Sequence, residues 1–172
     1  FQKFVEDIEE SIKIFKNKLG YNPIYFSYPF GEYNLEQKNY ISNNFEFAFG
    51  QHSGVIDLNK DRYELPRFPI NEKYGEIKRF KEVISYLPLQ YKIIKPENKF
   101  MNDGENPPKM TIEFFKDQKN LENINCFSNE GSKWRKTKIV LIDNILNINF
   151  AEKFVERRGR INCSLKDESG WR

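Results

Sequence analysis

The stretch Ile24–Asn34 reads IYFSYPFGEYN, and it decides the fold class that we predict. An apolar run without alternation, Ile24 to Tyr28, predicts a short strand that is covered on both faces. Pro29 and Gly31 then form a turn, and Asn34 with Gln37 three residues later predicts the start of a helix. In α/β folds, ligands bind at the carboxyl ends of strands, where such a turn lies.

The elements around this stretch continue the α/β pattern. An apolar stripe with helical spacing precedes it and consists of Phe1, Phe4, Val5, Ile8, Ile12, Phe15 and Leu19. A short helix to about Ser42, strands at 45–49 and 65–70, and a helix at 75–86 follow it. This order predicts part of a parallel-strand α/β domain.

Composition limits the classes of function. The chain has 172 residues, a net charge of +3, 31% charged and 16% aromatic residues. Because Lys and Arg are scattered among acidic residues, we expect no nucleic-acid partner. No apolar run is long enough to span a membrane. The aromatic content favours an aromatic-lined groove. The chain begins inside a helical pattern and closes just after a turn, so we expect a piece of a longer protein.

The character of the sequence changes after residue 94. Residues 95–109 are polar and contain Asn102-Asp103-Gly104 and Pro107-Pro108, which is typical of a linker. Strand patterns follow at 110–115, 124–127, 138–142, 145–150 and 160–165, and Asp143-Asn144 is a hairpin signature. We therefore predict an α/β domain over 1–94, a linker over 95–109, and a small antiparallel β-sandwich over 110–172. Trp134 and Trp171 are expected in the sandwich core, with a sugar-stacking platform as the alternative.

Cys126 and Cys163 each follow an Ile-Asn pair in a strand-like segment. Two cysteines are too few for a disulfide scaffold, and we favour two buried thiols over a bridge. With a single histidine in the chain, a Cys/His zinc site is not expected.

Three segments carry candidate chemistry. The turn at Tyr28, Pro29, Phe30 and Gly31 offers aromatic faces for stacking on sugar rings, although it also reads as an ordinary strand-to-helix turn. His52 lies in a loop between Gly50 and Gly54 and is a candidate general acid, or else a solvated side chain. Arg67 is a candidate for orienting a carboxylate or binding an oxyanion, or for a structural ion pair.

Together these segments resemble the polysaccharide deacetylase family, over about residues 1 to 90. The motifs that carry the resemblance are FSYPFGEYN at 26–34, FAFGQHSG at 47–54, and ELPRFPI at 64–70 with Tyr74-Gly75. The match is to the later half of the family's catalytic domain. The resemblance implies a distorted (β/α) barrel, of which this chain would hold the C-terminal part.

The resemblance also implies an activity. Family members remove N- or O-acyl groups from polysaccharides with a divalent metal, usually zinc, held by an Asp-rich motif and a His-x-x-x-His motif. Neither motif occurs here, so we expect both upstream of Phe1 and no metal bound by this chain alone. The family often has Arg two residues before the turn proline, where this chain has Ser27, and Arg67 is a candidate substitute.

We therefore predict a polysaccharide deacetylase-like hydrolase, with this piece inactive by itself. Its catalytic residues would be His52 and Arg67. Its substrate-binding residues would be Tyr28, Pro29, Phe30, Gly31 and Tyr33, and its partner a glycan. The alternative is a non-catalytic carbohydrate-binding module, and a third class is an interaction domain built on the β-rich part. The resemblance implies a cell-envelope or extracytoplasmic location, whereas the residues themselves leave location and oligomeric state open.

Overall fold

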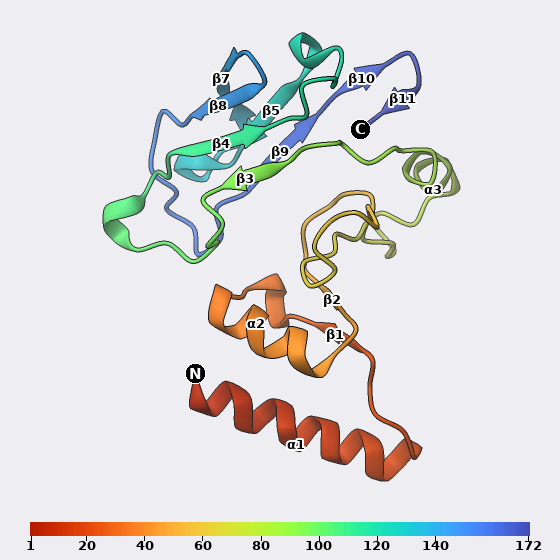
Figure 1. Ribbon diagram of the computed structural model, residues 1–172. Helices are drawn as coiled ribbons and strands as arrows, with labels where there is room; N and C mark the ends of the chain where they lie inside the picture. Colours follow the sequence, from red (N-terminus) through yellow and green to blue (C-terminus); the bar gives the residue numbers. More distant parts are fainter. The chain divides into compact units, whose positions relative to one another are not determined.

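The computed structural model describes all residues, 1–172 (Figure 1). The chain divides into two compact units, Phe1–Gly75 and Glu76–Arg172. The fold is a mixed α/β arrangement with few helices and several antiparallel sheets, and each unit is described by itself. No helix is both long enough and apolar enough to cross a membrane.

The first unit begins with the predicted amphipathic helix. Helix α1 spans Gln2–Leu19, and Gly20 ends it in the left-handed conformation, with a φ of 82°. Its apolar stripe packs inward at Ile8, with Phe4 and Ile12 beside it. This prediction from periodicity is confirmed.

Two short strands form the sheet of this unit. Strand β1 (Tyr25–Ser27) pairs in parallel with β2 (Phe47–Phe49). Between them lie a 3-10 turn, η1 (Pro29–Gly31), and helix α2 (Leu35–Asn44). The capping box of α2 is present as predicted, because Asn34 and Gln37 exchange side-chain-to-backbone hydrogen bonds.

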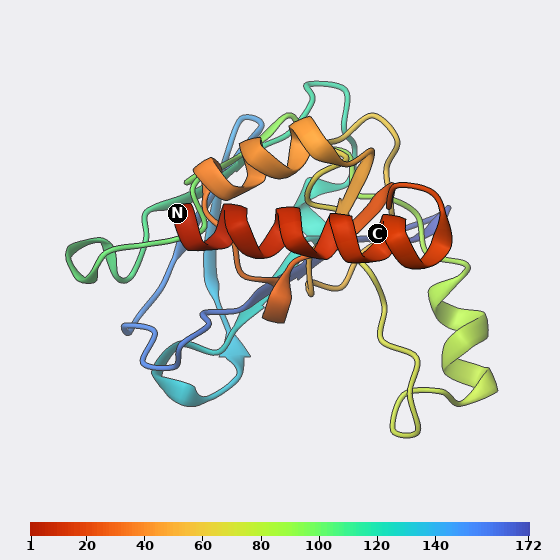
Figure 2. The ribbon, with the colours of Figure 1, turned by 90° about the horizontal axis from the view of Figure 1, so that it is seen from below.

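The two faces of this sheet differ. Phe26 and Ala48 point into a core shared with α1 and α2, which lie side by side (Figure 2). On the opposite face, Tyr25 is 60% exposed and its ring stacks on that of Phe47 at 5.8 Å. The expectation that the strand is covered on both faces is therefore wrong, because this unit supplies only one covering layer.

The first unit does not form a closed barrel. Its parallel sheet has two strands, and Phe49 makes one further parallel bridge to Leu65. Two strands and a bridge cannot close on themselves. The predicted partial (β/α) barrel is thus found only as a small parallel sheet with helices on one face.

The second unit is mostly β structure. It begins with helix α3 (Ile77–Val83). Its strands are β3 (Ile93–Lys95), β4 (Met110–Glu113), β5 (Asn125–Ser128), β6 (Arg135–Lys136), β7 (Lys138–Ile142), β8 (Ile145–Asn149), β9 (Ile161–Ser164), β10 (Lys166–Asp167) and β11 (Gly170–Trp171). Short 3-10 turns are η2 (Asp103–Glu105), η3 (Leu121–Asn123) and η4 (Glu130–Ser132).

These strands form antiparallel sheets, as predicted. A four-stranded sheet has the order β3-β4-β8-β7, a three-stranded sheet has the order β6-β5-β9, and β10 pairs with β11. The main core contains residues of both larger sheets, among them Ile112 and Leu146 of one and Cys126 of the other. The predicted hairpin at Asp143-Asn144 joins β7 to β8, and Asp143 takes the positive φ of 53° that glycine usually supplies.

The boundary between the two units, after Gly75, lies upstream of the predicted boundary at residue 94. Lys95, the first residue of the predicted linker, belongs to strand β3. The predicted ranges 1–94, 95–109 and 110–172 stay a prediction.

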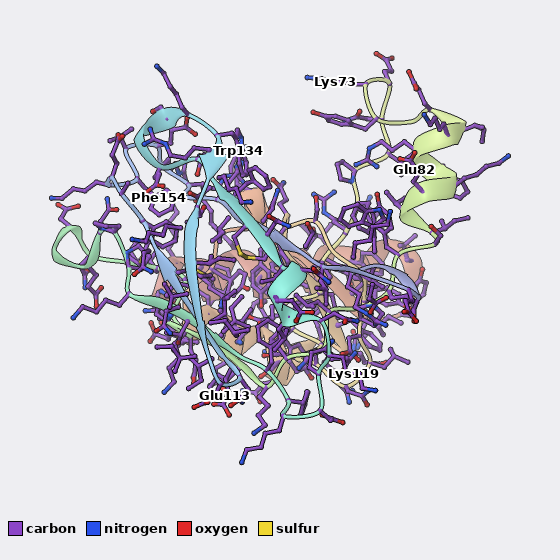
Figure 3. All side chains as sticks on the ribbon, turned by 90° about the horizontal axis from the view of Figure 1, so that it is seen from above. Lys73, Glu82, Glu113, Lys119, Trp134 and Phe154 are labelled. Carbon is purple, nitrogen blue, oxygen red and sulfur yellow. A yellow bond between two sulfur atoms is a disulfide. The ribbon has the colours of Figure 1, made fainter.

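Two interpretations of single residues were wrong. Cys126 and Cys163 form a disulfide (Figure 3) rather than remaining thiols, because β5 and β9 place them directly opposite each other, with their Cα atoms 4.1 Å apart. Trp134 and Trp171 are not core residues, since they are 51% and 46% exposed. Smaller side chains of the two sheets fill the core instead.

Candidate functional site

Three segments that are distant in sequence meet at the carboxyl ends of the parallel strands. The backbone N–H of Tyr28, just after β1, donates to the carbonyl of Phe49 at 3.0 Å. The N–H of Gly50, just after β2, donates to the carbonyl of Leu65 at 3.0 Å. The turn after β1, the loop after β2 and the segment from Leu65 to Arg67 therefore share one edge of the unit, as the parallel arrangement requires.

The tyrosines beside the turn are buried. Tyr28 is only 2% exposed, and its ring stacks on that of Tyr33 with 4.3 Å between centroids. The Tyr28 hydroxyl donates to the carbonyl of Tyr63, and the Tyr33 hydroxyl donates to Glu64, both at 3.0 Å. Burial, followed by the nearby charge of Glu64, raises the pKa of Tyr33 well above its usual range. Both tyrosines anchor the turn from beneath, and the Tyr28 ring offers no face to a solute.

The turn itself projects outward. Phe30 is 63% exposed and adopts a left-handed backbone with a φ of 56°, which costs about 1–3 kcal/mol for a side chain of this kind. Gly31 follows at a φ of 71°, and a Cβ there would lie 2.6 Å from the Cβ of Gln51. The sequence Pro-Phe-Gly therefore permits two things at once: an aromatic ring displayed on a strained turn, and close contact with the loop after β2.

His52 and Arg67 are brought together by the structure. The N–H of Arg67 donates to the carbonyl of His52 at 3.0 Å, and the Arg67 Nε donates to the carbonyl of Gly50 at 3.1 Å. A Cβ at Gly50 would lie 2.7 Å from the His52 Nδ1, so glycine lets the imidazole fold back over the loop. Both side chains are exposed. This places an imidazole and a guanidinium at the edge where the aromatic turn also lies.

Sequence reasoning missed an ionic cluster next to these residues. The Lys38 ammonium on α2 lies 2.7 Å from Asp61 and 3.3 Å from Glu64. Burial lowers the pKa of Lys38, but the hydrogen bond that Lys38 donates to Asp61 and the two negative charges outweigh burial and raise the pKa overall. The cluster ties the segment that leads to Arg67 onto α2. No sequence spacing identifies it, because Lys38 is more than twenty residues from both partners.

The residues of this chain do not form a metal centre. No group of three or more His, Cys, Asp and Glu side chains is arranged to hold an ion. His52 is the single histidine, and the Asp61 and Glu64 carboxylates of the ionic cluster are both paired with Lys38.

Comparison with known proteins gives no relative. No family model matches the chain, and no curated protein or solved structure matches it. The case for a function comes from the motifs and from the edge at which they meet.

Proposed function

We propose that this chain is part of a polysaccharide deacetylase-like hydrolase that removes N- or O-acyl groups from a glycan. The proposal includes the finer fold, in which residues 1–94 contribute to a (β/α) barrel and residues 110–172 form a β-sandwich. It also includes a divalent metal, zinc by resemblance. Because the residues present do not fit such an ion, its ligands would come from elsewhere in the complete protein, and we derive no step through it.

The observation that supports the proposal most is the convergence of the three resemblance motifs. Gly31 contacts Gln51, Gly50 hydrogen-bonds to Leu65, and Arg67 hydrogen-bonds to Gly50. These contacts join segments from 26–34, 47–54 and 64–70 at the carboxyl ends of parallel strands, where α/β proteins bind ligands.

The exposed side chains at this edge have distinct roles in the proposal. Phe30 forms the substrate wall, with Pro29 and Gly31 fixing its backbone, while Tyr28 and Tyr33 hold the turn from beneath. Hydrolysis breaks the acyl C–N or C–O bond, and the leaving nitrogen or oxygen must gain a proton. In the proposal, His52 donates that proton. Arg67 orients the acyl oxygen or a carboxylate.

The test uses the full-length protein and measures acetate release from an acetylated oligosaccharide such as chitotetraose. We expect His52→Ala to lower kcat at least tenfold, because proton donation contributes about 10²–10⁴-fold in enzymes. Phe30→Ala should raise KM with a smaller effect on kcat. Gln51→Ala, next to His52 in the loop, is the matched control and should retain activity.

Each outcome decides between the functions. Acetate release that is unaffected by His52→Ala removes His52 from catalysis, and unchanged release in Arg67→Ala removes Arg67. Saturable glycan binding without any acetate release favours the alternative, a non-catalytic carbohydrate-binding module. Absence of both binding and release overturns the proposal.

A further inference from the structure

A small pocket lies in the second unit, at the end of the three-stranded sheet. It has a volume of about 260 Å³ and is lined by Tyr86, Ser164, Trp171 and Arg172. These residues come from the segment after α3, from the end of β9 and from β11. The volume is below the range of about 300–1,000 Å³ that holds drug-sized ligands, so the pocket suits one ring rather than a large molecule.

The backbone around this pocket is fixed by hydrogen bonds. The N–H of Leu87 donates to the carbonyl of Trp171 at 2.8 Å, and Leu165 and Arg172 exchange a pair of hydrogen bonds at 3.0 and 2.8 Å. The turn before Trp171 is closed by Asp167, whose Oδ1 accepts from the N–H groups of Ser169 and Gly170. The positions of Trp171 and Arg172 are thus set before any ligand arrives, which lowers the ordering cost of binding.

The charges beside the pocket belong to Arg172 and Lys166. The Arg172 Nε donates to the Asp167 Oδ2 at 2.8 Å, and the Arg172 Nη1 donates to the carbonyl of Pro88 at 3.3 Å. The guanidinium is therefore already paired with a carboxylate. The Lys166 ammonium lies 5.5 Å from the centroid of the Trp171 ring, where it interacts with the π system. An anion would have to compete with Asp167 for Arg172.

The chemistry of the lining combines ring faces with a few polar groups. Tyr86 and Trp171 supply aromatic surface, Trp171 remains largely exposed, and Ser164 and the outer N–H groups of Arg172 supply hydrogen-bonding partners. A pyranose ring presents the complementary surface, with C–H groups on its faces for aromatic contact and hydroxyls at its rim. A purely apolar ligand would form no hydrogen bonds with the Ser164 hydroxyl or with the outer N–H groups of Arg172.

We propose that this pocket binds one neutral sugar ring of a polysaccharide, at a site separate from the edge that carries His52 and Arg67. The choice of a glycan as ligand rests on the proposed function, whereas the position of the pocket and the pairing of Arg172 with Asp167 do not. Trp171 is the main contact in this proposal, Tyr86 the second ring, and Ser164 and Arg172 the hydrogen-bonding partners.

The chain provides its own reporter for a test. Trp134 and Trp171 are its two tryptophans, and Trp134 lies outside the pocket, on the turn before β6 (Figure 3). In Trp134→Phe, the emission of the 172-residue chain comes from Trp171 alone. We expect a saturable change of this emission on titration with chitotetraose or cellotetraose. A tetramer of galacturonic acid should bind at least tenfold more weakly.

A matched pair of variants separates this pocket from other exposed aromatic side chains. Binding of the neutral tetramers, followed by titration calorimetry, should weaken at least tenfold in Trp171→Ala and stay within twofold in Trp134→Ala. Both substitutions replace an exposed tryptophan, and circular dichroism shows whether each variant is folded. If Trp171→Ala is unfolded, Tyr86→Leu and Ser164→Ala provide the same comparison with smaller changes.

Three results would overturn the proposal. These are no saturable binding of either neutral tetramer, equal losses in Trp171→Ala and Trp134→Ala, and tighter binding of the acidic tetramer or of an RNA oligomer. The outcome is distinguishable from failure of the proposed function, because the pocket is tested by binding and the edge with His52 by acetate release. A protein that binds through Trp171 but releases no acetate would support this site and refute the hydrolase.

Discussion

The two units bury their sheets in different ways. In the second unit, the antiparallel sheets β3-β4-β8-β7 and β6-β5-β9 share one core, and a disulfide lies within it. In the first unit, β1 and β2 are parallel, and helices cover only the face that carries Phe26 and Ala48. Parallel sheets are ordinarily covered on both faces, whereas antiparallel sheets tolerate one face in water. The first unit is thus the one whose sheet has an uncovered aromatic face.

This difference predicts that the two units respond separately to substitutions. Both tryptophans belong to the second unit, so tryptophan fluorescence follows its unfolding. The longest helix, α1, belongs to the first unit and dominates the circular dichroism signal at 222 nm. Each prediction below uses the signal of one unit and takes the signal of the other as its control.

The largest expected effect concerns the disulfide. Replacing both Cys126 and Cys163 by Ala should lower the free energy of unfolding of the second unit by about 4 kcal/mol, because the bridge closes a loop with a sequence separation of 37. Urea unfolding followed by tryptophan fluorescence measures this loss. The 222 nm transition of α1 should not move, and an equal shift of both transitions would contradict the independence of the units.

The second prediction concerns alkaline pH and the first unit. Burial raises the pKa of Tyr28 and of Tyr33 above the value near 10 of an unfolded chain, with the charges of Asp61 and Glu64 adding to the effect. The native state therefore keeps protons that the unfolded chain loses. Its stability is fully present below pH 10 and falls as pH rises above it, by about 1.4 kcal/mol per pH unit for each tyrosine.

Urea unfolding at pH 9, 10 and 11, followed at 222 nm, measures this fall. The double variant Tyr28→Phe/Tyr33→Phe is the control. It lacks both phenols, so its free energy of unfolding should change less with pH. Equal slopes in the variant and the parent would mean that other groups titrate, and would remove the role of the buried tyrosines.

The third prediction concerns the strained turn. Phe30→Gly should stabilise the first unit by up to about 1 kcal/mol, because glycine adopts the left-handed backbone without a Cβ penalty but loses more conformational entropy on folding. Phe30→Ala keeps the Cβ and should give no such gain. If Phe30→Gly destabilises the unit, the ring contributes packing that outweighs the strain.

Local patterns predicted several elements of the fold correctly. The stripe of α1, the capping box of Asn34 and Gln37, and the hairpin at Asp143-Asn144 are each encoded within a few residues. Such features depend on backbone geometry and on neighbours one turn away, so the sequence alone is sufficient. The sequence did not predict that His52 meets Arg67, because their contact depends on the loop after β2 pairing with the segment that begins at Leu65.

Features that depend on distant pairing were not predictable. Cys126 faces Cys163 only because β5 and β9 pair in one register out of many. The Ile-Asn-Cys sequence around each cysteine does not specify that register. The burial of Tyr28 likewise depends on a distant residue. Its hydroxyl donates a hydrogen bond to the backbone carbonyl of Tyr63, thirty-five residues further along the chain. The exposure of Tyr25 was missed because an apolar run indicates an apolar environment but not whether a second layer exists.

The last prediction tests directly whether a second layer covers this sheet. Tyr25 and Phe26 are neighbours on β1 that face opposite sides of the sheet. Phe26→Ala should cost about 3 kcal/mol, as for an aromatic side chain in a core. Tyr25→Ala should cost about 1 kcal/mol, since it removes exposed aromatic contacts with Phe47 and Phe49 and leaves no cavity in the core. Urea unfolding at 222 nm measures both. Equal costs would mean that the face carrying Tyr25 is covered in solution, and the contrast between the two units would then lie in strand direction alone.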